Sequence, residues 1–283
     1  MSEIRIAWRN LLSRPVLSGV SVVILAMGIA LAIAVLILAQ TLEDGLVRAA
    51  RPFDLLVGAK GSANQLVMST ILLQDAPLGN VPYSYFEKLS RDPRVASAIP
   101  VALGDNAFGV PIIGVDEKFF QLNDPQTGKP IFEIARGNMF QDKDHHEEHQ
   151  SAEEERQAVI GARVADTFDL GTTVQSAHGT IGTSVTERHE IYYHVVGVLK
   201  PSGSPWDRAI FVPIDSYWDA HEKTSSEPAV TAAMIRPIGV KEFYQLHQEI
   251  NQDSVAQAVL SGKGMQELFD RIDQGKSILT MVS

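Results

Sequence analysis

VLSGVSVVILAMGIALAIAVLILA, residues 16–39, decides how this chain is organised. These 24 residues carry no charge, and a helix of that length spans roughly 36 Å, enough to cross a hydrocarbon core of about 30 Å. We therefore predict a transmembrane helix at residues 16–40. A cleaved signal peptide usually has an apolar core of about 7–15 residues, and a soluble core helix is rarely apolar all round. Both alternatives fit less well, and a passive anchor is the third.

Charge on the flank of this stretch predicts its orientation. Three arginines, at positions 5, 9 and 14, precede it against a single acid, Glu3. Cytoplasmic flanks of membrane helices collect arginine and lysine. The N-terminus is therefore predicted to be cytoplasmic and residues 41–275 periplasmic, which places the chain in the inner (cytoplasmic) membrane of a bacterium.

Residues 1–15 are predicted to form a cytoplasmic elbow helix before the span. On such an amphipathic helix Arg5, Trp8 and Arg9 would lie in the headgroup layer and contact membrane lipid. The alternative is a basic flank with no helix of its own.

Small residues recur at helical spacing within the span. They form one stripe and one neighbouring pair: Ala26, Ala30 and Ala34, with Gly28 and Ala32 beside them. Small residues let membrane helices approach closely, so we expect helix packing here. The alternative is that alanine is simply common in membrane helices.

Composition limits the function. The chain has no cysteine, so neither a disulfide framework nor a thiolate metal site can form. Its net charge of −10 argues against nucleic acid as a partner.

The pattern after the span predicts an α+β domain, a mixed periplasmic domain of two lobes. Short β-like runs occur at 53–57, 67–73, 95–103, 109–115, 157–160, 191–199, 209–212, 229–235 and 255–260. Helices are predicted at 82–91, 162–168, 214–221, 240–251 and 265–272.

Several of these runs, in this order, resemble a known family. They are FDLLVGAKGS (53–62), LGNVP (78–82), DPRV (92–95), IPVALGD (99–105), IGV (113–115), AVIG (158–161), VVGVL (195–199) and SGSPWDRA (202–209). The series resembles the periplasmic core domain of MacB/FtsX/LolC-type ABC transporter permeases. The resemblance implies four membrane helices, one before the domain and three after it.

The resemblance also implies partners and a mechanism. Such permeases form homodimers or heterodimers, work with a cytoplasmic ABC ATPase and are expected to meet a periplasmic partner protein. They transmit ATP-driven helix movement to the periplasmic domain, which drives export or extraction of a substrate. Residues 276–283 look like the start of a second span, so we expect a truncated permease. ATP is then used only by the partner ATPase, and this chain is not expected to be an enzyme.

An acidic, histidine-rich insertion at residues 142–155, DKDHHEEHQSAEEE, carries seven acids, one lysine and three histidines. Like-charge blocks of this kind are usually solvated and mobile. The alternative is zinc capture by the donor set His145, His146, His149, Asp144 and Glu148, whose nitrogen and oxygen atoms suit zinc.

His178 and His189 are a second candidate zinc pair, provided that a hairpin brings them together. A histidine on a strand is more often a hydrogen-bonded structural residue. In the run 191–196, alternation places Tyr193 and Val195 opposite Tyr192 and His194. The loop 200–208 is predicted to be a turn that packs the Trp206 indole on the domain, and an exposed indole would instead indicate a partner surface.

Two other classes of protein stay open at this point. One is a membrane-anchored periplasmic zinc-binding module, part of a metal-linked transport system, and the other is an anchored zinc hydrolase. The chain has no G-x-S-x-G or H-E-x-x-H motif. Gly275-Lys276-Ser277 lacks the earlier glycine of a phosphate-binding loop.

Overall fold

The computed structural model describes residues 12–50, 52–125, 127–140, 156–178, 187–221 and 227–261. For residues 42, 43, 46–48, 178 and 187–190 it describes the backbone alone. The chain divides into two compact units, Met1–Asp44 and Gly45–Ser283. The first contains most of the long helix α2 (Pro15–Ala50), and the second contains the domain.

The domain is built on one mixed sheet of ten strands in the order β12-β1-β11-β3-β4-β9-β6-β8-β5, with β7 pairing β3 and β8. The strands are β1 (Leu55–Ala59), β3 (Val95–Ala107), β4 (Val110–Val115), β5 (Ile134–Gly137), β6 (Arg156–Ile160), β7 (Thr173–His178), β8 (Glu187–Leu199), β9 (Ile210–Pro213), β11 (Ala232–Pro237) and β12 (Ala256–Leu260). The predicted α+β class is confirmed.

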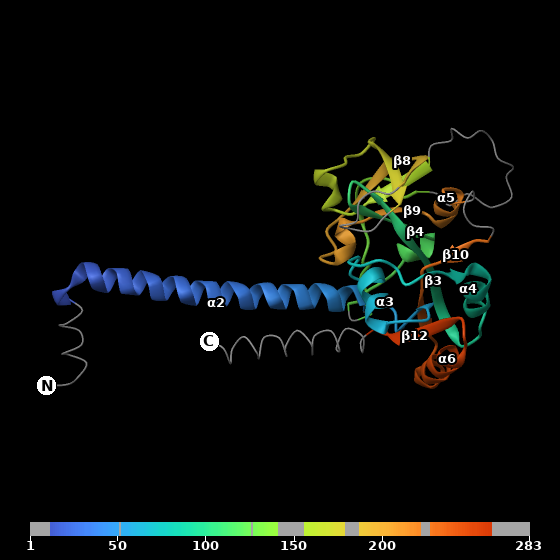
Figure 1. Cartoon of the computed structure of the whole chain (residues 1–283), viewed down its shortest axis with the longest axis horizontal. Coiled ribbons are helices and arrows are strands. Elements are labelled where there is room, and N and C mark those ends of the chain that lie inside the picture. The colour runs from blue at the N-terminus through green and yellow to red at the C-terminus, as the bar shows by residue number, and fades with distance from the viewer. Residues whose placement is uncertain are drawn as a thin grey trace. The chain divides into compact units, whose positions relative to one another are not determined.

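Helices and short elements complete the domain. They are α3 (Ala63–Thr70), α4 (Tyr83–Ser90), α5 (Ile214–Asp219), α6 (Val240–Gln252), the short strands β2 (Val81–Pro82) and β10 (Ala229–Val230), and the 3-10 turns Glu117–Phe119, Val164–Asp166 and Pro205–Arg208. Figure 1 shows α4, α6 and β12 toward one end of the domain and β8 toward the other, with β4 and β9 between them.

Six strands of the sheet close into a ring. The pairs run β3–β4, β4–β9, β9–β6, β6–β8 and β8–β7, and β7 returns to β3. The first half of β3 pairs with β11 instead, so β3 belongs to both the closed ring and an open sheet of β12, β1 and β11. The ring and the open sheet share β3 within one compact unit, Gly45–Ser283, and the predicted division into two lobes stays a prediction.

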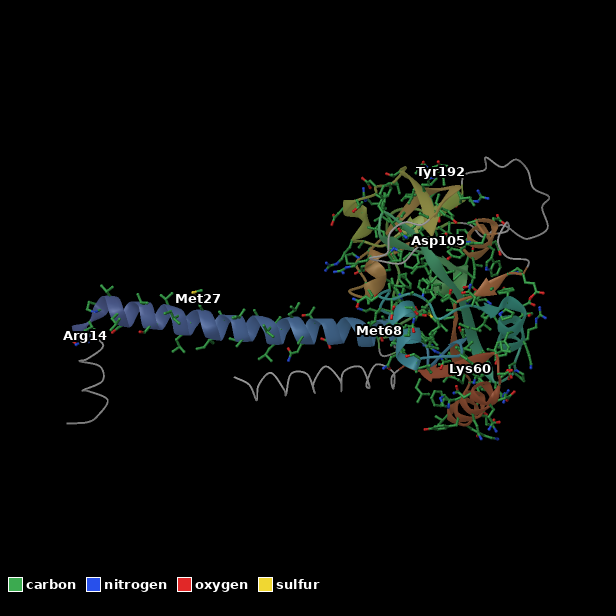
Figure 2. The ribbon with its side chains drawn as sticks, in the orientation of Figure 1. Arg14, Met27, Lys60, Met68, Asp105 and Tyr192 are labelled. Atoms are coloured by element: carbon green, nitrogen blue, oxygen red, sulfur yellow. The ribbon has the colours of Figure 1, made fainter. Side chains whose placement is uncertain are left out.

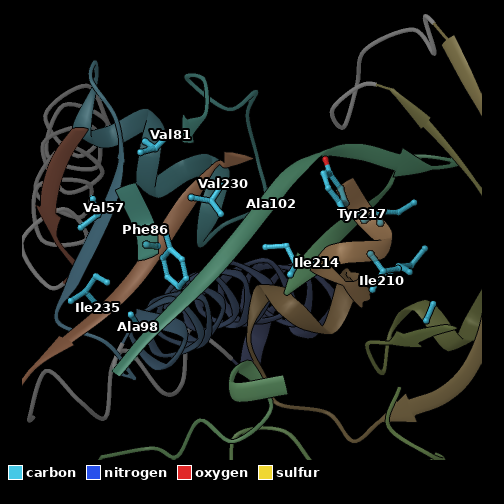
Figure 3. Close-up of a cluster of buried hydrophobic side chains, with 14 of the residues drawn as sticks. Val57, Val81, Phe86, Ala98, Ala102, Ile210, Ile214, Tyr217, Val230 and Ile235 are labelled. Atoms are coloured by element: carbon cyan, nitrogen blue, oxygen red, sulfur yellow. The ribbon is translucent and has the colours of Figure 1, made fainter. Parts of the chain in front are cut away.

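Alternation along the ring strands separates two hydrophobic clusters. One face of each ring strand contributes to a single cluster, with the members Ile112, Ala158, Ile160, Val174, Tyr193, Val195, Ile210 and Val212. Figure 3 shows that this cluster continues along β3, with Tyr217 and Ile214 of α5 on one side of the strand and Phe86 of α4 on the other. The opposite faces contribute to a second cluster that contains the aromatic residues Phe119, Phe120, Phe132, Phe140, Trp206 and Phe211.

Most predicted elements are present, and three differ. The run 67–73 was predicted as a strand but lies mostly in α3, because Ser62 caps the helix by accepting a hydrogen bond from Gln65 N at 3.3 Å. The run 162–168 forms only a 3-10 turn. The run 229–235 divides at Thr231, whose hydroxyl bonds the backbone of Leu103 on the neighbouring strand. The predicted helix at 265–272 lies outside the described residues.

Candidate functional site

Helix α2 is long and apolar enough to cross a membrane. The segment Pro15–Thr41 has 27 residues and a mean hydropathy of 3.1, and none of its most apolar window is buried inside the protein. A core helix of a soluble protein is mostly buried, which this segment is not. The small-residue stripe stays a prediction: among the described residues, no atom lies within 4 Å of the position that a Cβ on Gly28 would take. Arg5, Trp8 and Arg9 lie outside the described residues.

The last turns of α2 are packed into the domain. Ala49, Ala50 and Phe53 are almost fully buried, and they belong to the same hydrophobic cluster as Trp206. Gly45 lies against the loop 200–208, so closely that an added Cβ would stand 2.9 Å from the carbonyl oxygen of Gly203. We call Gly45, Ala49 and Ala50 of α2, together with Phe53 just after the helix, the docked end of α2.

The loop that contacts the docked end is held by a buried carboxylate. Asp207 Oδ1 accepts hydrogen bonds from Ser202 N at 2.8 Å and from Ser202 Oγ at 2.6 Å, and Oδ2 accepts one from Gly203 N at 2.9 Å. The Trp206 indole, 1% exposed, packs against Phe119 and Phe132 with ring centroids 5.2 and 5.5 Å away. The predicted packing of Trp206 on the domain is therefore confirmed, and these contacts hold the loop 200–208 beside the docked end of α2.

The end of β12 lies beside the docked end. Leu260 of β12 pairs with Leu55 of β1, so the two strands meet where β1 begins and β12 ends. Just beyond this pair, Ser261 Oγ donates a hydrogen bond to Phe53 O at 2.7 Å. The start of β1 and the end of β12 thus lie at one end of the same strand pair.

A second polar arrangement lies in the ring, where Asp105 of β3 is buried. Its Oδ2 accepts a hydrogen bond from Ser176 Oγ at 2.6 Å, and its Oδ1 lies 3.2 Å from Nε2 of His221, which follows α5. The other ring nitrogen of His221, Nδ1, lies 2.8 Å from the carbonyl oxygen of Tyr217. Figure 2 shows Asp105 in the part of the domain that also carries Tyr192, away from Lys60.

Burial and charge shift the titration of the groups around Asp105. Burial opposes the charged form of His221, but the hydrogen bond and the charge of Asp105 outweigh it and raise the His221 pKa above its usual value. Burial, followed by the charge of Asp105, raises the pKa of Tyr217 well above its usual value. Tyr217 also stacks on His221, with ring centroids 4.8 Å apart.

These residues do not form a hydrolytic triad. In a triad the serine hydroxyl is hydrogen-bonded to the histidine that takes its proton, whereas Ser176 donates to Asp105 and the carboxylate stands between Ser176 and His221. The arrangement is suited to holding a charge in place, and gives no support to the zinc hydrolase alternative.

The structure describes only some of the predicted metal ligands. The first set, His145, His146, His149, Asp144 and Glu148, lies outside the described residues. For the second set the backbone register is described: His178 pairs with Glu187 across the β7–β8 hairpin, and His189 lies two residues beyond Glu187. His194 lies on the same strand with Tyr192, opposite the buried Tyr193 and Val195, as alternation predicted.

An apolar helix of membrane-spanning length that continues into a mixed α+β domain is consistent with a membrane-anchored domain. The chain belongs to the family of MacB-like periplasmic core domains, whose model matches residues 18–278. The resemblance inferred from the sequence is therefore confirmed. Permease domains of this family are non-catalytic parts of ABC transporters.

Two solved structures match most of this chain at low identity. The periplasmic region of MacB from Actinobacillus actinomycetemcomitans matches with 12% identity and a TM-score of 0.46, over 79% of this chain and 97% of that one. The extracellular domain of the ABC-type transporter YknZ from Gram-positive bacteria matches with 12% identity and a TM-score of 0.42, over 72% and 98%. Comparison with curated proteins finds no significant match.

Proposed function

We propose that this chain is the permease subunit of a MacB/LolC-like ABC transporter in the bacterial inner membrane, with its N-terminus in the cytoplasm. A separate cytoplasmic ATPase hydrolyses ATP, and the permease converts the resulting helix movement into a conformational change of the periplasmic domain. That change drives export or extraction of a substrate. The permease acts as a homodimer or heterodimer and meets a periplasmic partner protein.

The docked end of α2 is the observation that carries this proposal. A helix that only anchors a domain needs no fixed contact with it, and a flexible linker serves that purpose. Here the helix continues without a break from Pro15 to Ala50, and Ala49, Ala50 and Phe53 are buried in a core cluster. A displacement of the helix along or about its axis is therefore transmitted to β1 and to the loop 200–208.

The position of β12 supports the same conclusion. The start of β1 follows the docked end of α2, and the end of β12 lies beside it in the same strand pair. A movement passed on by the docked end therefore acts on β1 and β12 together. It would shift this pair against the closed ring, with β11 and β3 between them.

Co-purification with a candidate cytoplasmic ABC ATPase from the same bacterium tests the proposal, followed by hydrogen exchange of the complex with and without ATP. We expect the two proteins to purify together and ATP to change the exchange rates of amides in β1 and β12. A complex with an ATPase that binds ATP but cannot hydrolyse it separates the effect of binding from that of turnover. Failure of the ATPase to co-purify, or exchange that ATP leaves unchanged, would contradict the proposal.

A membrane-anchored periplasmic zinc-binding module is the second candidate function. Its predicted ligands in the insertion 142–155 lie outside the described residues, and among the described residues no three metal donors converge. Such a module works without an ATPase, so the co-purification experiment also separates the two functions.

A further inference from the structure

Three residues between α2 and β1, which are Pro52, Phe53 and Asp54, are bonded to the sheet on two sides, and we call them the junction. On one side, Nη2 of Arg236 on β11 donates a hydrogen bond to Pro52 O. On the other side, Ser261 just after β12 donates from Oγ to Phe53 O at 2.7 Å and from its backbone N to Asp54 O at 3.1 Å. Each carbonyl group of the junction therefore has a partner on β11 or at the end of β12.

Arg236 reaches the junction because of its place on β11. Side chains two apart on a strand lie on the same face, so Arg236 continues the row of Ala232 and Met234, which belong to the same hydrophobic cluster as Phe53. The register of β11 with β3 shifts between Arg236 and Pro237, and irregularities of this kind re-aim a side chain. A half-buried positive charge thus lies at the end of an apolar row, beside the end of α2.

The hydrogen bond from Arg236 also suits the end of a helix. Helix α2 ends at Ala50, and the last four carbonyl groups of a helix have no partner within it. An arginine near this end bonds carbonyl oxygens, and its charge is favourable at the negative end of the helix dipole. The ring of Pro52 fixes its φ angle, which removes one rotation from the junction. Arg236 and Pro52 together leave the chain little freedom to bend between α2 and β1.

A connection of this kind between a helix and a strand is where a hinge would otherwise form. Hinges are a few residues at the ends of helices and strands that absorb changes in backbone angles. If the junction bent freely, a movement of α2 would be taken up there and would not reach β1. Asp54 N also donates to Ile235 O at 3.1 Å, so the junction is bonded to β11 through the backbone as well, next to Arg236. The junction is therefore built as a stiff link.

We propose that Arg236 is the positioning residue that keeps the junction stiff, so that movement of α2 is transmitted to β1 and its neighbouring strands. The inference rests on the proposed function, in which α2 moves when the partner ATPase hydrolyses ATP. Burial of Ala49 and Ala50 holds the helix against the domain, and Arg236 prevents the chain after the helix from bending. Without the guanidinium, the helix stays docked but the junction opens more often.

Hydrogen exchange of the full chain in detergent tests this role without the ATPase. Arg236→Met removes the donor and keeps most of the apolar stem. Loss of a hydrogen bond from a charged group should speed exchange of the Asp54 amide by at least about 10-fold, and Arg236→Lys, which keeps the charge but not the fork of donors, should speed it less. Arg94→Met is the matched control, because it removes another half-buried guanidinium, whose partners Asp92 and Glu249 lie outside the junction. We expect this control to leave the exchange of Asp54 unchanged.

The same proteins are then assembled with the candidate ABC ATPase, and exchange of β1, β11 and β12 is measured with and without ATP. We expect Arg236→Met to hydrolyse ATP but to lose most of the ATP-dependent change in exchange, and Arg236→Lys to keep more of it. Arg94→Met should keep the whole change, which separates the loss from a general loss of stability.

The outcomes distinguish this inference from the proposed function. Asp54 exchange that Arg236→Met leaves unchanged would overturn the inference alone, and so would a full ATP-dependent change in the Arg236→Met complex. A wild-type complex in which ATP changes no exchange would contradict the proposed function, and the inference with it. Circular dichroism shows whether each variant folds. If Arg236→Met does not fold, Arg236→Gln, which is shorter and uncharged, is judged by the same criteria.

Discussion

Replacing Asp207 by Asn tests how firmly the loop 200–208 is held against the docked end of α2. The carboxylate is 5% exposed and accepts three hydrogen bonds, two from Ser202 and one from the Gly203 amide. Asparagine has nearly the same shape, and its amide oxygen can keep both bonds from Ser202. Its NH2 group then faces the N–H of Gly203, so one charged hydrogen bond is lost and a donor is left without an acceptor.

The expected size of this effect follows from that single lost bond. A hydrogen bond to a charged group contributes about 1.5–3 kcal/mol. In a domain of this size each kcal/mol changes the melting temperature by about 2–4 °C, so Asp207→Asn should lower it by about 3–12 °C. Circular dichroism melts of the full chain in detergent measure the change.

Asp166→Asn is the control for the loss of a negative charge alone. Asp166 is an exposed residue of a 3-10 turn, and exposed substitutions usually change stability by no more than about 0.5 kcal/mol. The reasoning would be refuted if Asp207→Asn melted within about 2 °C of the wild type, the range expected for an exposed site.

Three further predictions concern the membrane helix, the acid response and the aromatic cluster. Ala30→Leu in the small-residue stripe should reduce cross-linking between membrane helices, since a larger side chain prevents close approach, while Leu31→Ala should not; equal cross-linking of both variants would contradict the stripe. The hydrogen bond from Arg94 lowers the pKa of Asp92 in the folded protein. The stabilisation by this hydrogen bond is therefore complete above the usual carboxyl pKa of about 3.9, and it is lost as the pH falls through the lower pKa of the folded state. Arg94→Met should therefore lower the melting temperature at pH 7, and the difference from the wild type should shrink below about pH 4; a constant difference would count against it. Trp206→Ala should cost about 3–5 kcal/mol in unfolding free energy, measured by denaturant titration, and a cost below about 1 kcal/mol would show that the indole is not a packed core residue.

The sequence predicted those features that depend on local pattern. The helix α2 is visible as an uncharged apolar run, and the strand from Ile191 onward as a two-residue alternation of side chains. Both were placed correctly. Ser62 is a local signal for the start of a helix. The apolar run 67–73 that follows it was instead interpreted as a strand, so most of α3 was predicted wrongly. Strand β7, TVQSAH, is short and largely polar, so its position depends on the neighbours β3 and β8 and not on its own pattern.

The two polar sites depend on contacts that no local pattern contains. Ser176 and Asp105 are separated by 71 positions, and Asp105 and His221 by 116. His178 was singled out from the sequence as a candidate ligand, whereas Asp105 and His221 were not, because only the fold brings Asp105 and His221 together. The contact between Gly45 and Gly203 was missed for the same reason: two glycines 158 positions apart carry no signal of their own until the fold brings their backbones together.

The central claim is that the docked end of α2 transmits movement to the domain, and one comparison tests it most directly. Gly45→Leu places a large side chain where even a Cβ would stand 2.9 Å from the Gly203 carbonyl oxygen, whereas Gly19→Leu changes a glycine of the same helix that has no neighbour within 4 Å. Both variants are assembled with the partner ATPase, and hydrogen exchange of β1 and the loop 200–208 is measured with and without ATP. The account predicts that Gly45→Leu hydrolyses ATP but loses the ATP-dependent change in exchange, while Gly19→Leu keeps it. A full ATP-dependent change in the Gly45→Leu protein would contradict the claim.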